Sequence, residues 1–165
     1  MKNCNYKYDS ISNLKISDID LSKGLSVVNT AKALSILNGS ASSIPLDFTL
    51  NIEVHNPNTS HAAFQALQYI IRIDDIEFTT GNIAQAFSVA SGETKQLPIH
   101  IGIDLATLAS NHSKTTIGNI VKNFIGIGDE KSNVALLLKP TYHVGGSTIT
   151  SPVYIPVGFT FGGRK

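Results

Sequence analysis

The chain has 165 residues, enough for a sizeable hydrophobic core, and we expect residues 1–165 to form a single domain. Only 15% of the residues are charged and the formal net charge is +1, so the sequence indicates no basic surface for nucleic acid. The single cysteine excludes an internal disulfide framework and a cysteine-based zinc site.

Residues 1–10 are mostly polar and predict a flexible N-terminal tether that contains Cys4. A cysteine this near the start, followed by polar residues, fits the lipidated first residue of a mature lipoprotein. Residues 1–3 would then be an added remnant or the end of a removed signal. The alternative is a free thiol on a frayed terminus of a cytoplasmic protein.

Residues 25–38 are the first predicted helix, with Val28, Ala31, Leu34 and Leu37 in register and Asn38-Gly39 as the stop. The next segment, 46–55, alternates strictly between apolar and polar side chains, and this alternation predicts a strand with one buried face. Its apolar members are Leu46, Phe48, Leu50, Ile52 and Val54.

Asn56, Pro57 and Asn58 end that strand. Proline cannot donate a hydrogen bond to a ladder and favours an extended conformation in the residue before it. Asparagine side chains bond to nearby backbone and stabilise turns. We therefore interpret the motif as structural.

Further strands follow, most of them with the same alternation. Asp74-Asp75 interrupts the pattern after residues 67–73, and Ile76 and Phe78 continue it on the opposite parity, which predicts a tight hairpin. The remaining strands are predicted over 97–105, 134–144 and 149–161. The 134–144 strand is apolar on both faces at first, so we expect it to be central.

Residues 115–125 predict a second helix with an apolar arc of about 140°. Ser113 is the expected N-cap, and Gly126 or Gly128 the stop. The apolar side chains cannot remain in water and must cover the protein core, a partner or an apolar ligand. They are Ile117, Ile120, Val121, Phe124 and Ile125.

The element order predicts a mainly β fold, an antiparallel β-sandwich with one or two inserted short helices. The segment from "EVHNPN" through "LQYIIRIDDIEFTTG" to "ETKQLPIHIGIDL" resembles the late embryogenesis abundant group-two family, also called the water-stress and hypersensitive-response (WHy) domain. The resemblance covers residues 46–105. It implies an immunoglobulin- or fibronectin-like sandwich without enzymatic activity, in which Asn56, Pro57 and Asn58 are structural. Segments 25–38 and 106–130 are additions to its pattern.

No catalytic motif is present, and we predict no catalytic residue, cofactor or metal site. His55, His100 and His143 fall on polar strand faces, where exposure is the default. The resemblance implies a stress-protective or structural protein, with bacterial members often lipoproteins of the periplasm or outer membrane.

Two functional hypotheses follow. In the first, the protein contacts another envelope protein and is tethered to a membrane through Cys4. In the second, it binds a lipid or other apolar molecule beneath helix 115–125, with Ile117, Ile120, Val121 and Phe124 as the contact face.

Overall fold

The computed structural model describes residues 4–21, 26–39, 42–144 and 147–163. Its three helices are α1 (Val27–Asn38), α2 (Leu105–Asn111) and α3 (Lys114–Phe124). Its strands are β1 (Asn5–Ile16), β2 (Ile19–Asp20), β3 (Pro45–His55), β4 (Ala62–Phe64), β5 (Ala66–Ile73), β6 (Ile76–Ile83), β7 (Phe87–Val89), β8 (Thr94–Asp104), β9 (Ser132–Val144), β10 (Ser147–Thr150) and β11 (Ile155–Phe161). The predicted mainly β antiparallel sandwich is confirmed, with three short helices instead of one or two.

One sheet has the order β2-β1-β3-β8, and all its pairs are antiparallel. The central strand β3 pairs with β8 from Pro45 opposite Asp104 to His55 opposite Thr94. The alternation over 46–55 has the predicted effect, because each of its five apolar side chains is fully buried in the core.

The second sheet is built around β9, as expected for a strand that is apolar on both faces. Strands β5, β10 and β11 all pair with β9. Strand β6 pairs with β5 and completes the sheet. Asp74 and Asp75 form the predicted tight turn between β5 and β6. Both residues have positive φ, 50° and 67°. A two-residue hairpin turn of type I′ requires positive φ at both of its central residues. Strands β4 and β7 form a separate small sheet.

Two sequence predictions about the strands are wrong. Residues 149–161 form two strands, because the chain leaves the ladder after Ser151, whose N–H still donates to Pro140 O, and pairs with β9 again only from Ile155. Residues 5–10 are not a flexible tether, because they belong to β1 and pair with β3 from Asn5 opposite His55 onward. Of the predicted tether, residues 1–3 lie outside the described residues.

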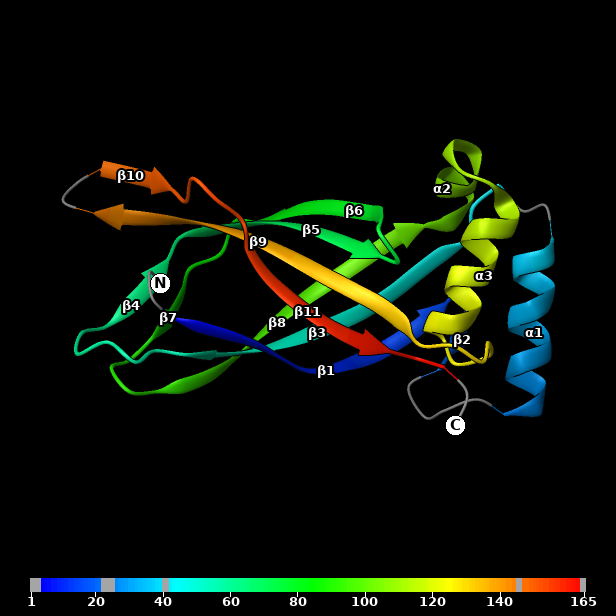
Figure 1. The fold of residues 1–165 in the computed structure, drawn as a ribbon, viewed down its shortest axis with the longest axis horizontal. Helices are drawn as coiled ribbons and strands as arrows, with labels where there is room; N and C mark the ends of the chain where they lie inside the picture. Colours follow the sequence, from blue (N-terminus) through cyan, green and yellow to red (C-terminus); the bar gives the residue numbers. More distant parts are fainter. Residues whose placement is uncertain (1–3, 22–25, 40–41, 145–146, 164–165) are drawn as a thin grey trace.

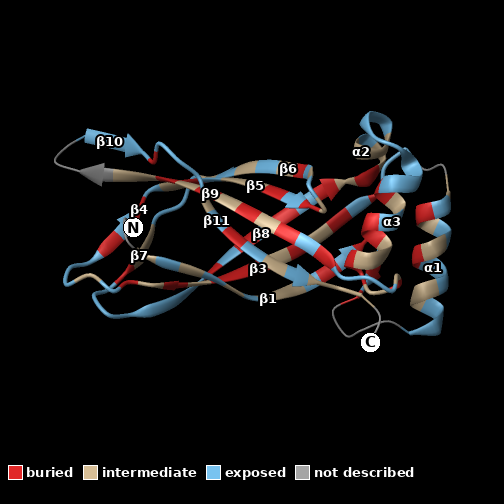
Figure 2. Cartoon of the chain, in the orientation of Figure 1, coloured by how far each residue is buried: buried red, intermediate tan, exposed pale blue. Residues whose placement is uncertain are grey.

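All three helices gather at one end of the sandwich, with α1 outermost (Figure 1). Each begins at a side-chain cap, in which Ser26, Asp104 and Ser113 accept hydrogen bonds from backbone N–H groups of α1, α2 and α3. Helix α3 ends at the positive-φ Gly126. Figure 2 shows that the exposed surface of α1 is extensive, since only Ala33 and Leu37 of this helix are buried.

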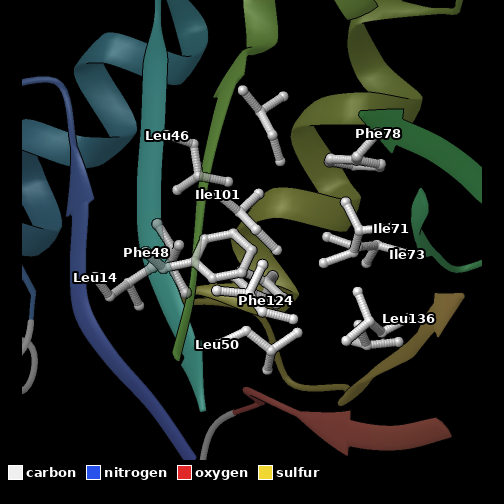
Figure 3. Packing of buried hydrophobic residues seen from close by; sticks show 14 of the residues in the cluster. Leu14, Leu46, Phe48, Leu50, Ile71, Ile73, Phe78, Ile101, Phe124 and Leu136 are labelled. Atoms are coloured by element: carbon white, nitrogen blue, oxygen red, sulfur yellow. The ribbon is translucent and has the colours of Figure 1, made fainter. Parts of the chain in front are cut away.

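The core lies between the two sheets and extends under α3. Figure 3 shows Phe48 and Ile101 of one sheet facing Ile71 and Leu136 of the other, with Phe124 of α3 among them. All five side chains are fully buried. Helix α3 has only eleven residues and would be unstable on its own. The burial of its apolar side chains in this core supplies the missing stabilisation.

Candidate functional site

The predicted contact face of α3 is part of the protein's own core. Ile117, Ile120, Val121 and Phe124 are all buried. The Phe124 ring lies between two other aromatic rings, with its centroid 5.2 Å from those of Phe48 and Phe161. Of the three alternatives for this face, the protein core is the one that holds for Val121 and Phe124, because protein side chains already fill the space beneath them. These two side chains therefore do not serve a partner or an apolar ligand, whereas Ile117 also lines a pocket.

Asn56 is fully buried and holds three chain segments together. Its Nδ2 donates to Ser60 O at 2.9 Å and to Val89 O at 3.0 Å, and its Oδ1 accepts from Asn58 N at 3.0 Å. Its backbone N–H also donates to Glu93 O and its carbonyl accepts from Gly92 N. Pro57 is exposed beside it. Every polar atom of Asn56 thus makes a hydrogen bond within the protein, and none is directed to a ligand.

Cys4 is half-buried just before β1 and packs against the edge of the core. Burial raises the pKa of its thiol, which lowers the thiolate fraction and so the reactivity of the sulfur at neutral pH. Tyr142 lies nearby, since burial and, second, the charge of Cys4 raise the pKa of Tyr142. This position does not favour a nucleophilic role.

The histidines have ordinary surface environments. His55 Nδ1 is 2.8 Å from Thr94 Oγ1, and His100 Nε2 is 3.9 Å from Asp47 Oδ1 in an exposed pair. The side chain of His143 lies outside the described residues. Among the residues that the structure describes, no group of three or more His, Cys, Asp or Glu side chains could hold a metal ion. Nor does any described helix have both the length and the apolar character to cross a membrane.

A pocket that the sequence did not predict lies among the three helices. Its volume is about 300 Å³, and its wall is largely apolar. The lining side chains come from the end of α1, the residue before β3, α2 and the first turns of α3. They belong to Leu37, Ile44, Leu105, Ala106, Ala109, Ser110, Lys114 and Ile117, with the glycines at 39 and 118 completing the wall. Since these residues are up to 81 positions apart, no local pattern could have revealed the pocket.

Large apolar side chains are exposed at both ends of the molecule. At the helical end they are Val27 and Val28, at the start of α1. At the other end they are Ile149 on β10 and Val153 and Tyr154 in the link to β11 (Figure 1). Lys139 Nζ lies 5.0 Å above the centroid of the Tyr154 ring, so this second group has a cationic neighbour.

No protein-family model matches this chain. A search of curated proteins likewise gives no match. The solved structures with a similar fold include three that match at low identity. A crystal structure of a protein from Archaeoglobus fulgidus has 12% identity, covers 93% of this chain and 96% of its own, and has a TM-score of 0.46. A solution structure named for a late embryogenesis abundant (LEA) protein has 13% identity, 99% and 74% coverage, and a TM-score of 0.49. A solution structure of a protein from Arabidopsis thaliana has 12% identity, 77% coverage of both chains and a TM-score of 0.44.

Proposed function

We propose that this chain is a non-catalytic β-sandwich protein of the cell envelope, tethered to a membrane through a lipid on Cys4 and acting by contact with another envelope protein. The observation that carries the proposal is the position of Cys4 near exposed apolar side chains. Tyr142 lies within the electrostatic reach of Cys4, and its partner across the β9–β10 ladder is Ile149, which is 46% exposed.

The exposed group Ile149, Val153 and Tyr154 supports a contact surface at the Cys4 end. Apolar side chains that are exposed together beside polar ones are typical of protein–protein or membrane contacts. Tyrosine with a neighbouring lysine suits such a surface, because both side chains have an apolar body and a polar tip. Val153 is 64% exposed, so a partner that covers it would remove substantial apolar area from water.

A structural or stress-protective role is the form of non-catalytic activity that the sequence resemblance supports. The low charge and the absence of a catalytic motif in the sequence agree with it. Protection can be tested directly by freezing and thawing a labile enzyme with the purified protein and, as the control, with an equal mass of serum albumin. The recovered activity of the labile enzyme is then compared. Better recovery than with albumin is expected, and equal recovery would restrict the proposal to partner binding.

The tether is tested by isolating the protein from its native source and measuring its intact mass in the membrane and soluble fractions. We expect the membrane fraction to contain a chain that begins at Cys4 and carries a lipid. A Cys4→Ser protein, expressed in the same cells, should move to the soluble fraction. A wild-type chain with a free Cys4 thiol, found only in the soluble fraction, would contradict the tether.

The contact surface is tested by cross-linking in membranes with two matched variants. Val153→Ser/Tyr154→Ser removes exposed apolar area at the Cys4 end, and Val27→Ser/Val28→Ser removes it at the helical end. We expect the first variant to lose a cross-linked envelope protein that the second retains. Equal cross-linking by both variants would exclude this surface as the contact.

A further inference from the structure

The pocket among the three helices has an open wall at Gly118. Glycine within a helix is less favourable than alanine by roughly 1 kcal/mol, so its presence at the middle of α3 needs a reason. Protein packing does not supply one, because a Cβ placed on Gly118 would meet no atom within 4 Å. The missing side chain instead leaves space in the pocket, whose wall also includes Ala106 and Ala109 of α2.

Lys114 gives this apolar pocket a positive charge. Its Nζ donates to Gly39 O, and to Asn38 O at 3.5 Å, at the end of α1. Both acceptors are neutral carbonyl groups, so these bonds leave the charge of the ammonium uncompensated by a carboxylate. An ammonium has three N–H donors, and two carbonyl groups leave one for a further acceptor.

The carboxylate of Asp104 is hydrogen-bonded to the pocket wall. Its Oδ1 accepts from Ile44 N at 3.0 Å and from Ala106 N at 3.1 Å, while its Oδ2 accepts from Ser43 Oγ at 3.1 Å. Ile44 and Ala106 both line the pocket. Asp104 therefore joins two parts of the wall and is directed at backbone donors, which reduces its repulsion of an anion near Lys114.

We infer that this pocket binds a small amphipathic anion, specifically a medium-chain fatty acid. The carboxylate would accept from Lys114 Nζ, and the alkyl tail would contact Leu37, Ile44 and Ile117. A volume of about 300 Å³ holds about ten non-hydrogen atoms at the roughly 30 Å³ that one water molecule occupies in the liquid, which is the size of octanoate. This site lies beside Ile117, apart from the filled core beneath Val121 and Phe124, and does not depend on the proposed function.

The charge requirement is tested by titrating the isotopically labelled full chain with octanoate, octanol and octylammonium. We expect saturable binding of octanoate, with amide shifts at Ala106, Ala109 and Gly118, and at least about tenfold weaker binding of the other two. Lys114→Met keeps most of the length of the side chain but removes its charge. This substitution should weaken the affinity for octanoate about tenfold and leave the affinity for octanol unchanged. A tenfold change is about what one hydrogen bond to a charged group contributes to binding.

The position of the site is tested by filling the pocket. Gly118→Leu places a side chain in the open space and improves helix propensity, so the variant should fold and lose octanoate binding. Asn119→Leu adds the same side chain at the next, exposed position and should bind as the wild type does. No saturable octanoate binding, equal affinity for octanoate and octanol, or unchanged affinity in both Gly118→Leu and Lys114→Met would each overturn the inference.

Discussion

The ring of Tyr69 on β5 lies over Gly81, its partner across the ladder on β6. A Cβ placed on Gly81 would lie 2.4 Å from both Cζ and Oη of Tyr69, closer than any real contact. The glycine thus provides the space in which the ring covers the strand, and the tyrosine hydroxyl donates to His100 O of β8 at 3.4 Å. This arrangement links the two sheets at one edge of the sandwich.

Gly81→Ala should therefore destabilise the fold, because the Tyr69 ring must move. Overpacking of this kind costs about 1–3 kcal/mol in the free energy of unfolding, measurable by urea titration. Gly158→Ala is the matched control, since the nearest atom to its Cβ would be Val134 O at 4.0 Å. We expect no loss there, and equal effects of the two substitutions would contradict the role of the ring.

Asn56→Ala should lower the free energy of unfolding by at least about 2 kcal/mol. It leaves the carbonyl groups of Ser60 and Val89 without their donor and Asn58 N without its acceptor. Asn56→Asp keeps the acceptor but turns an oxygen toward both carbonyl groups, so it should also destabilise. Because a protonated carboxyl can donate and burial raises its pKa in the folded state, the deficit of Asn56→Asp relative to wild type should shrink as the pH falls toward about 4, the ordinary pKa of aspartate in the unfolded chain. A wild-type unfolding midpoint in Asn56→Ala would show that the motif is not structural.

Phe124→Ala should cost about 3–5 kcal/mol, since it leaves a cavity between Phe48 and Phe161 in the core. Thermal and urea unfolding of the isolated protein measure this loss directly. Asn119→Ala, on the exposed side of the same helix, should be neutral or slightly stabilising because alanine is the better helix former. A Phe124→Ala protein with wild-type stability would mean that α3 does not pack as described.

Asp104 gives a stability that depends on acid pH. Hydrogen bonds from Ile44 N and, to a lesser extent, Ala106 N and Ser43 Oγ hold the pKa of its carboxyl below the ordinary value. The ionised form therefore stabilises the folded state above pH ~4, and this contribution is lost as the pH falls through the lowered pKa. Asp104→Asn should be less stable than wild type at pH ~7, and urea titrations at successive pH values should show the gap narrow below pH ~4. A gap that stays constant with pH would contradict the assignment.

Tyr6 has a buried hydroxyl that finds no hydrogen-bond partner among the described residues. Tyr6→Phe removes this unsatisfied group and should raise the free energy of unfolding by about 1 kcal/mol. Burial, followed by the charges of Tyr142 and Cys4, raises the pKa of Tyr6. Wild type should therefore lose stability as the pH rises above ~10, where tyrosine ionises more readily in the unfolded chain, and Tyr6→Phe should lose less. A destabilised Tyr6→Phe protein would show that the hydroxyl has a partner after all.

Strand β3 and helix α3 could be predicted from sequence because each carries its pattern within one segment. Strand β1 could not, since its pairing with β3 shifts register between Tyr8 and Ser10 and again between Ser12 and Lys15, which removes a strict period of two. The break between β10 and β11 is also hidden, because apolar residues keep the same parity on both sides of it. Helix α2 has only seven residues, so its Asp104 cap was the sole local signal.

The pocket was beyond sequence reasoning for a different reason. Its wall is shared by α1, the residue before β3, α2 and α3, and each segment contributes between one and four side chains that have an ordinary interpretation as core or surface. In the sequence alone, Gly118 is simply a poor helix former within α3. Its meaning depends on the empty space beside it, which is a property of the assembled helices.

The place of β9 at the centre of its sheet also determines when the protein can fold. Strand β9 occupies Ser132–Val144, so β5 and β6 leave the ribosome long before the strand that must pair with β5 has been made. Until then, Leu67, Ile71 and Ile73 lack the neighbouring strand β9 that completes their burial, and the open edge of β5 can pair with another chain. Nascent chains stalled before Ser132 should therefore depend on chaperones, and release from that dependence should coincide with the emergence of β9.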